Sequence, residues 1–340
     1  MQFDIIIGNP PYQQGDGGHG ASAMPIYQHF VRHAKKLNPR YISLIIPARW
    51  FTGGKGLNDF RREMLNDERI RTLHDYPNSK DCFPNVAIEG GVCYFLWDRT
   101  YSGQCKIFTH MNGEVHESER KLLSPYSETF IRFPEQLSIV EKVWANKTVA
   151  FAVIVSALKP YGLRTDFFTS GAKKYGLPPV SETNISGGLT IYGLGDKQQR
   201  TERHVPADYP VPKGRELIGK WKVFVPEALG AGKTMVKGIP AKILGDSFVG
   251  SPNSVCTETF LNVGAFSTKE EAENCLGYIK TKFFRFLVGI IKTTQHATQR
   301  VYQIVPLQDF GESWSDAKLY KKYGLTSSEI EFIESMIREM

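Results

Sequence analysis

Apolar and polar positions in the first hundred residues alternate with two different periods. Short apolar runs, typical of buried strands, lie at residues 3–7, 41–47, 70–76 and 92–97. Apolar positions three and four residues apart, typical of amphipathic helices, lie at residues 25–37 and 57–65. A strand, a helix and a second strand in this order form a right-handed parallel crossover. The pattern therefore predicts an α/β fold in which these strands share one sheet.

The pattern changes after residue 98. Short β-like pieces at 106–110 and 149–155 alternate with turns, and helical spacing returns at 136–144 and 267–288. The last of these helices begins with a Ser/Thr-x-x-Glu cap, and two short helices are predicted around Gly324. We therefore expect a mixed α+β second part. We divide the chain into residues 1–110, 111–305 and 306–340.

The charge balance points to an anionic partner. The 340-residue chain has a net charge of +7, and residues 200–300 hold 15 Lys or Arg against 9 Asp or Glu. Most of the excess positive charge therefore lies in the second half, and nucleic acid is the natural candidate for a partner. A basic surface in contact with solvent alone would give the same composition.

Other residue types exclude several classes of protein. The five cysteines are an odd number without a C-x-x-C pair, which favours reduced thiols in a cytoplasmic protein. No apolar run reaches the roughly 18 residues of a membrane helix, and the run after Met1 is too short for a signal peptide. His29 and His33 lie four residues apart, but no third ligand joins them, so we predict no metal site.

Asn9-Pro10-Pro11-Tyr12 directly follows the first predicted strand. The two prolines stiffen the chain, so that the Asn9 carboxamide and the Tyr12 ring are presented at the carboxyl end of the strand. Ligands bind at this end of the strands in open α/β sheets. An amide and a ring on a stiff loop suit a planar ligand with an amino group, such as a nucleobase. A proline-stiffened surface turn is the alternative.

The sequence FDIIIGNPPYQ resembles the catalytic loop of adenine-N6 DNA methyltransferases of type II restriction-modification systems, within the Eco57I-like methylase family. The resemblance implies that the Asn9 side chain and the Pro10 carbonyl accept hydrogen bonds from the adenine amine, and that Tyr12 stacks on the flipped base. It also implies Phe83 as a second aromatic wall. The chain would then transfer a methyl group from S-adenosylmethionine to N6 of an adenine in a specific sequence of double-stranded DNA.

The same resemblance implies a fold. Residues 1–110 would be the C-terminal half of a Rossmann-like methyltransferase sheet, with parallel strands and one antiparallel strand, and would lack the N-terminal cofactor-binding segment. Only Asn9 would lie near the cofactor, and the strand at 3–7 would have an unpaired apolar edge. We expect an N-terminal methylase fragment or subunit, or a longer form of the protein, to complete the site. A restriction endonuclease is a further candidate partner.

The remaining expectations concern DNA binding. Arg49 follows the second strand and is expected to meet a phosphate. Residues 111–305 would form the target DNA recognition domain, in which four basic residues would contact phosphates: Lys280, Lys282, Arg285 and Lys292. We interpret the glycine-rich residues 13–20 as a flap over the substrate pocket, with a disordered insertion as the alternative. A non-catalytic DNA-binding specificity fragment of a split or truncated methylase is the alternative function.

Overall fold

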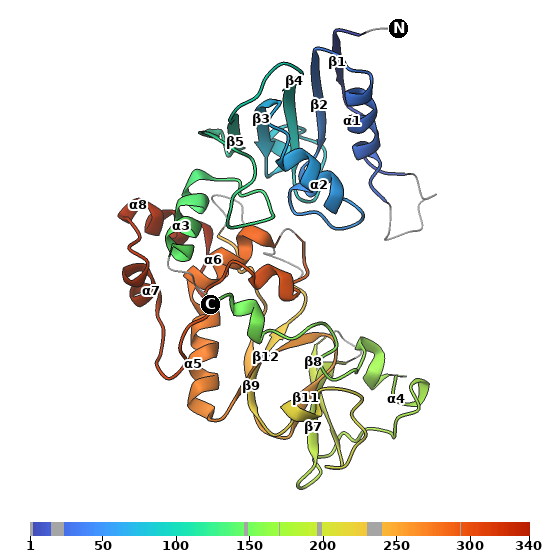
Figure 1. Cartoon of the computed structure of the whole chain (residues 1–340). Coiled ribbons are helices and arrows are strands. Elements are labelled where there is room, and N and C mark those ends of the chain that lie inside the picture. Colours follow the sequence, from blue (N-terminus) through green and yellow to red (C-terminus); the bar gives the residue numbers. More distant parts are fainter. Residues whose placement is uncertain are drawn as a thin grey trace. The chain divides into compact units, whose positions relative to one another are not determined.

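The computed structural model describes residues 3–14, 24–145, 149–169, 171–195, 199–229, 240–292 and 294–340. These residues pack into two compact units, one that runs up to Glu141 and one that begins at Lys142 (Figure 1). Each unit is described by itself below. Residues 15–20 of the segment interpreted as a flap lie outside the described residues.

A six-stranded sheet with the order β1-β2-β4-β3-β5-β6 forms the centre of the first unit. Its strands are β1 (Ile5–Gly8), β2 (Tyr41–Pro47), β3 (Ile70–Tyr76), β4 (Val92–Asp98), β5 (Cys105–Met111) and β6 (Glu114–Arg120). The helices of this part of the chain are α1 (Tyr27–Lys36) and α2 (Asn58–Leu65), with the 3-10 helices η1 (Ala48–Phe51) and η2 (Ser79–Asp81). Helix α3 (Pro134–Trp144) crosses the point at which the second unit begins.

The sheet is mixed. Strand β1 pairs in parallel with β2, and β3 pairs in parallel with β5. Strand β4 lies between β2 and β3 and runs antiparallel to both, so the antiparallel strand expected at 92–97 is present. Strand β6 adds a second antiparallel strand at the far edge. Because β1 and β2 are parallel, the segments that follow them, at Asn9 and at Ala48, leave the sheet at the same end.

Helices α1 and α2 pack on one face of this sheet. Ile42, Leu44 and Ile46 alternate along β2 and are at most 5% exposed. They share one hydrophobic core with Val31 of α1 and Phe60 of α2. Successive side chains of a strand point to opposite faces, so this alternation fixes which face of β2 meets the helices. The packing holds the loops after β1 and β2 in place.

Strand β1 is an edge strand with apolar side chains on both faces. Ile6 packs against the core, whereas Ile5 and Ile7 point to the other face and are 55% and 76% exposed. Among the described residues, β2 is the only strand paired with β1. Strands with apolar residues on both faces are typical of the interior of parallel sheets. The structure therefore has the unpaired apolar edge that the sequence predicts.

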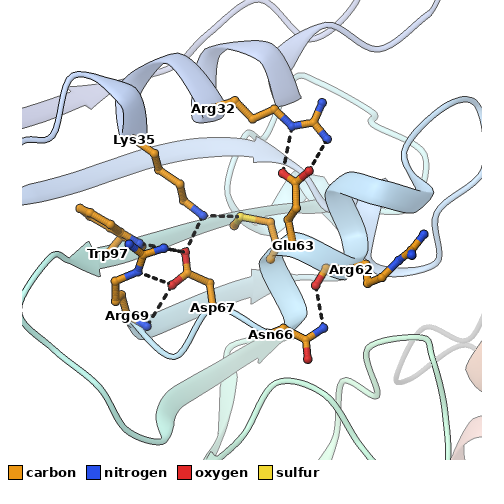
Figure 2. A network of polar contacts seen from close by, with 9 residues as sticks. Arg32, Lys35, Arg62, Glu63, Asn66, Asp67, Arg69 and Trp97 are labelled. Carbon is orange, nitrogen blue, oxygen red and sulfur yellow. Dashed lines mark hydrogen bonds and ion pairs between the residues drawn. The ribbon is translucent and has the colours of Figure 1, made fainter.

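A polar network centred on Asp67 connects α1 to the start of β3 (Figure 2). The Asp67 carboxylate accepts hydrogen bonds from Lys35 Nζ at 2.7 Å, Arg69 Nε at 2.7 Å and Trp97 Nε1 at 3.0 Å. Burial by itself would raise the pKa of Asp67, but the bonds and charges of Arg69 and Lys35 outweigh it and lower the pKa to about 2. This network fixes the position of α1 relative to the sheet.

Two three-stranded sheets, β10-β9-β12 and β11-β7-β8, lie in the second unit. Their strands are β7 (Leu189–Leu194), β8 (Arg200–Val205), β9 (Trp221–Pro226), β10 (Phe248–Gly250), β11 (Ser254–Cys256) and β12 (Phe260–Phe266). The helices of this unit include α4 (Gly171–Lys174), α5 (Lys269–Lys280), α6 (Lys282–Ile291), α7 (Asp316–Lys322) and α8 (Ser327–Met336). The 3-10 helices are η3 (Phe151–Ile154), η4 (Thr165–Phe168), η5 (Arg215–Leu217) and η6 (Gln299–Tyr302).

The sequence predictions for the second unit are correct in part. The mixed α+β character and the two terminal helices around Gly324, whose φ is 60°, are confirmed. The strand predicted at 149–155 is the 3-10 helix η3 with single bridges on either side. The helix predicted at 267–288 is two helices, because Thr281 adopts an extended backbone with φ −60° and ψ 150° and caps α6. The first unit ends at Glu141, beyond the boundary placed at 110, because β5 and β6 continue its sheet.

Candidate active-site pocket

The carboxyl ends of β1 and β2 border a cavity of about 850 Å³ within the first unit. Its lining comes from the loop after β1, the start of α1, the segments after β2 and the loop before β4: Asn9, Pro10, Pro11, Tyr12, Gln13, Pro25, Tyr27, Pro47, Arg49, Lys55, Ala87, Ile88 and Glu89. The structure thus brings the whole Asn9–Tyr12 stretch together with Arg49. Cavities of this size hold small ligands in many proteins.

Asn9 and Tyr12 present an amide and a ring on one wall. Pro10 is buried and anchors the loop, while Asn9 next to it is exposed. Tyr12 is half-buried, and its hydroxyl has no hydrogen-bond partner among the described residues. Burial raises the pKa of Tyr12, and the nearby Asn9 carboxamide opposes this effect although the two groups do not meet the geometry of a hydrogen bond. The Asn9 carboxamide and the Tyr12 hydroxyl therefore lie close together on this wall of the cavity.

Tyr27 and Arg49 bring two more unpartnered polar groups to the cavity. Tyr27 is the first residue of α1 and is 1% exposed, and neither its hydroxyl nor Arg49 Nε has a hydrogen-bond partner in the described part of the chain. Burial raises the pKa of Tyr27; the Arg49 charge and the nearby Trp50 backbone oppose this effect. Buried donors without partners are rare in proteins. Because both residues line the cavity, they are candidates for contact with a ligand.

The loop before β4 forms another wall of the cavity, and an ion pair next to the loop holds it in position. Arg132 donates to the Gly90 carbonyl at 2.5 Å and pairs with Asp75 at 3.2 Å. Asp75 is fully buried, and burial raises its pKa to about 6 although Arg132 opposes the shift. At Gly91, φ is 85° and an added Cβ would lie 2.1 Å from the Tyr76 carbonyl oxygen, so only glycine fits this turn.

Phe83, predicted as a second aromatic wall of the pocket, is replaced in the cavity lining by other residues of its loop. Phe83 is half-buried in the same loop but is not among the residues that line the cavity, where Ala87, Ile88 and Glu89 contribute instead. Sequence reasoning also missed Tyr27 and Lys55. Tyr27 follows Pro25 at the start of a helical pattern, a position that fits a core residue equally well, and only its unpartnered hydroxyl distinguishes it.

The four basic residues proposed to contact DNA phosphates differ in their surroundings. Lys280 is exposed. The side chain of Lys282 is 12% exposed and pairs with Glu334 and with Glu339. Arg285 is fully buried and donates to the Arg338 carbonyl at 2.8 Å and to the Thr281 carbonyl at 3.2 Å. Lys292 is 2% exposed. The burial of Arg285 and Lys292 indicates a role in packing, so of the four only Lys280 is presented to solvent.

The described residues contain no group of three His, Cys, Asp or Glu side chains that could hold a metal ion. All five cysteines are free thiols. None of the helices in the described ranges is long and apolar enough to cross a membrane.

Residues 1–83 match the model of the family described as Eco57I restriction-modification methylase. The resemblance predicted from the sequence is therefore confirmed for this part of the chain. A Mycoplasma pneumoniae protein named "Uncharacterized adenine-specific methylase" is 36% identical over 154 residues, which take in 43% of this chain and 36% of that protein.

Two solved structures of restriction-modification enzymes are also similar at low identity. The type IIG restriction endonuclease BpuSI is 12% identical, with a TM-score of 0.38, over 95% of this chain and 49% of that chain. The type IIL restriction-modification enzyme MmeI in complex with DNA is 10% identical, with a TM-score of 0.45, over 86% of this chain and 45% of that chain. The chain spans less than half the length of each of these relatives.

Proposed function

We propose that this chain carries the catalytic loop and the DNA-binding part of an adenine-N6 DNA methyltransferase of a restriction-modification system. The observation that carries the proposal is the position of Asn9, Pro10 and Tyr12 on one wall of a cavity, in the segment that matches the methylase family model. An exposed amide, a backbone carbonyl and a ring at the end of strand β1 suit a flat base with an exocyclic amine.

The proposed chemistry concerns the adenine amine, whose lone pair is delocalised into the ring. Hydrogen bonds from this amine to Asn9 Oδ1 and to the Pro10 carbonyl would favour a tetrahedral nitrogen and orient its lone pair. The protein's contribution is therefore orientation and electrostatics. The base must leave the duplex at a cost of a few kcal/mol. Stacking on Tyr12, worth about 1–3 kcal/mol, would offset that cost.

Other lining residues would hold the nucleotide. Arg49 and Lys55 bring two positive charges to the cavity against the single carboxylate of Glu89. Arg49 is the candidate for a phosphate contact, because its buried Nε has no partner among the described residues. For the second wall against the base, the geometry favours Ile88 over Phe83.

The methyl donor would be S-adenosylmethionine, which supplies an activated methyl group to the oriented amine. Of this chain's residues, Asn9 would lie closest to it. The open edge of β1, with Ile5 and Ile7 more than half exposed, is where another polypeptide segment would add a strand and complete the cofactor site.

The same open edge favours a second candidate function. If no such segment joins β1, the chain would be a non-catalytic DNA-binding specificity fragment. It would then bind DNA in a salt-dependent manner and would not bind S-adenosylmethionine.

The direct test is transfer of tritium from labelled S-adenosylmethionine to duplex DNA by the full chain, with any polypeptide encoded upstream of it added. We expect Asn9→Ala to lower the rate by about 100- to 1,000-fold, as for loss of one preorganised contact to the reacting group. Asn85→Ala is a matched control, because Asn85 is exposed in the loop before β4 and does not line the cavity.

Equal rates for Asn9→Ala and the unchanged protein would contradict the assigned mechanism. DNA binding without transfer or cofactor binding, also in the presence of the upstream polypeptide, would favour the specificity fragment. Calorimetry with the cofactor and a DNA-binding assay separate these outcomes.

A further inference from the structure

A second cavity, of about 750 Å³, lies within the second unit. The ends of β7 and β9, the start of β8 and the loop before β12 supply most of its lining: Leu158, Thr165, Leu194, Arg200, Pro226, Glu227, Ala228, Asp246, Glu258, Thr259 and Phe260. The charged side chains in this lining are three carboxylates and one guanidinium. Their partners determine which of them are available to a ligand.

The three carboxylates are already engaged by the protein. Glu258 Oε1 accepts hydrogen bonds from Thr165 N and Oγ1, both at 3.0 Å, and its other oxygen pairs with Lys159 at 3.2 Å. Glu227 accepts from His296 Nδ1 at 2.8 Å. Asp246 pairs with Lys242 at 2.5 Å. Burial by itself would raise the pKa of Glu258, but the hydrogen bonds from Thr165 and Lys159 keep it below its usual range. All three carboxylates therefore have partners within the protein.

Arg200 differs from these three carboxylates in its contacts. It is the first residue of β8 and is exposed, and its guanidinium has no hydrogen bond or ion pair to any described residue. Its guanidinium lies over the Phe248 ring, with Cζ 4.3 Å from the ring centroid. Phe248 is itself fixed by edge contact with Tyr192, at 4.9 Å between centroids. Stacking orders the guanidinium plane while leaving its N–H donors available, so that little rotational freedom is lost when they bind.

We propose that Arg200 reads a guanine in the DNA sequence that this protein recognises. The inference rests on the proposed DNA-binding function. An ordered guanidinium fork matches the O6 and N7 acceptors of guanine in the major groove. A phosphate is the other common partner of arginine, and the salt dependence of binding distinguishes it from a base.

The test is selection from a randomised duplex library with the full chain, followed by affinity measurement on the best sequence and on a scrambled one. We expect Arg200→Ala to abolish the preference for guanine at one position. It should weaken binding of the best sequence by about 10- to 100-fold and change scrambled binding by no more than about 3-fold. Arg200→Lys keeps the charge without the fork, and should also lose most of the discrimination.

Arg203→Ala is the matched control. Arg203 is on the same strand and lies 5.5 Å from the Phe168 ring centroid, but its guanidinium is already paired with Glu182 at 2.8 Å. The selected sequence should not change in this variant. Circular dichroism and thermal denaturation would establish that all three variants fold.

Two outcomes would overturn the role of Arg200 alone. Equal weakening on every sequence, with the slope of log affinity against log salt reduced by about one, would identify a phosphate contact. A selected sequence that is unchanged in Arg200→Ala, or absent in the unchanged protein although DNA binds, would exclude base reading by Arg200. Failure of the full chain to bind DNA at all would contradict both this inference and the proposed function.

Discussion

The first unit has two polar regions at opposite ends of one sheet, and they differ in how their polar atoms are bonded. At the amino end of β3, the Asp67 carboxylate accepts from Lys35, Arg69 and Trp97 (Figure 2). At the carboxyl ends of β1 and β2, Tyr12 Oη, Tyr27 Oη and Arg49 Nε have no hydrogen-bond partner within the described residues.

This difference separates stability from function. A buried polar group that is fully bonded contributes to folding, and its removal leaves partners unsatisfied. A buried polar group without a partner costs stability of about 1–3 kcal/mol, and a bound ligand can supply the missing bond. The Asp67 network therefore has a structural role, whereas we propose that the polar atoms around the cavity bind a ligand.

Asp67→Asn should give the largest effect on stability. The drop in the pKa of Asp67 from 3.8 to about 2 corresponds to about 2–3 kcal/mol of folding free energy at neutral pH. Because the folded pKa is depressed, this contribution is fully present above pH 3.8 and is lost as the pH falls through about 2. Urea denaturation at pH 7 should show the loss.

Two control variants accompany the Asp67→Asn prediction. Asp59→Asn removes an ion pair with Arg62 in which both side chains are more than 70% exposed, and it should change stability by no more than about 0.5 kcal/mol. Asn9→Ala should leave stability unchanged despite its large effect on transfer. A stable Asp67→Asn variant, or an unfolded Asn9→Ala variant, would contradict the division between the two regions.

Asp75 provides a smaller effect with the opposite dependence on pH. Burial raises its pKa from 3.8 to about 6, so its contribution is full below pH 3.8 and is lost as the pH rises through 6. The unfolding free energy of the unchanged protein, relative to Asp75→Asn, should therefore rise by about 1 kcal/mol between pH 7.5 and pH 5. A difference that stays constant or falls over this interval would show that Arg132 keeps Asp75 ionised.

The sequence is sufficient to predict features that depend on neighbours along the chain. The strand at 3–7 and the loop at Asn9 follow from local pattern and proline stiffness, whereas the unpaired edge is predicted from the family resemblance. The burial of Arg285 could not be predicted in this way. Its guanidinium donates to the carbonyls of Lys242 and Arg338, both more than 40 positions away.

Hydrophobic periodicity also cannot predict that the Tyr27 hydroxyl lacks a hydrogen-bond partner. Helical spacing identifies Tyr27 as a core position, and its 1% exposure agrees with that. Whether a buried hydroxyl finds an acceptor depends on the loops around it, which come from distant parts of the chain. Its functional interpretation therefore required the structure.

Tyr27→Phe should have the smallest effect on stability. The sign of that effect distinguishes a polar group without a hydrogen-bond partner from one that has a partner. Removing a hydroxyl without a partner should leave stability equal or higher, within about 1 kcal/mol. If the hydroxyl binds the target nucleotide, the KM for DNA should rise by about 5-fold, the equivalent of one ordinary hydrogen bond, with kcat less affected.

Tyr161→Phe is the corresponding change at a bonded hydroxyl, because Tyr161 Oη donates to Asn262 Oδ1 at 2.9 Å and the residue is fully buried. It should lower stability by about 1 kcal/mol or more, since the Asn262 oxygen loses its donor, and should not alter the KM for DNA at equal folded concentration. If Tyr27→Phe lowers stability as Tyr161→Phe does and leaves KM unchanged, the Tyr27 hydroxyl is structural and only Asn9, Tyr12 and Arg49 face the ligand.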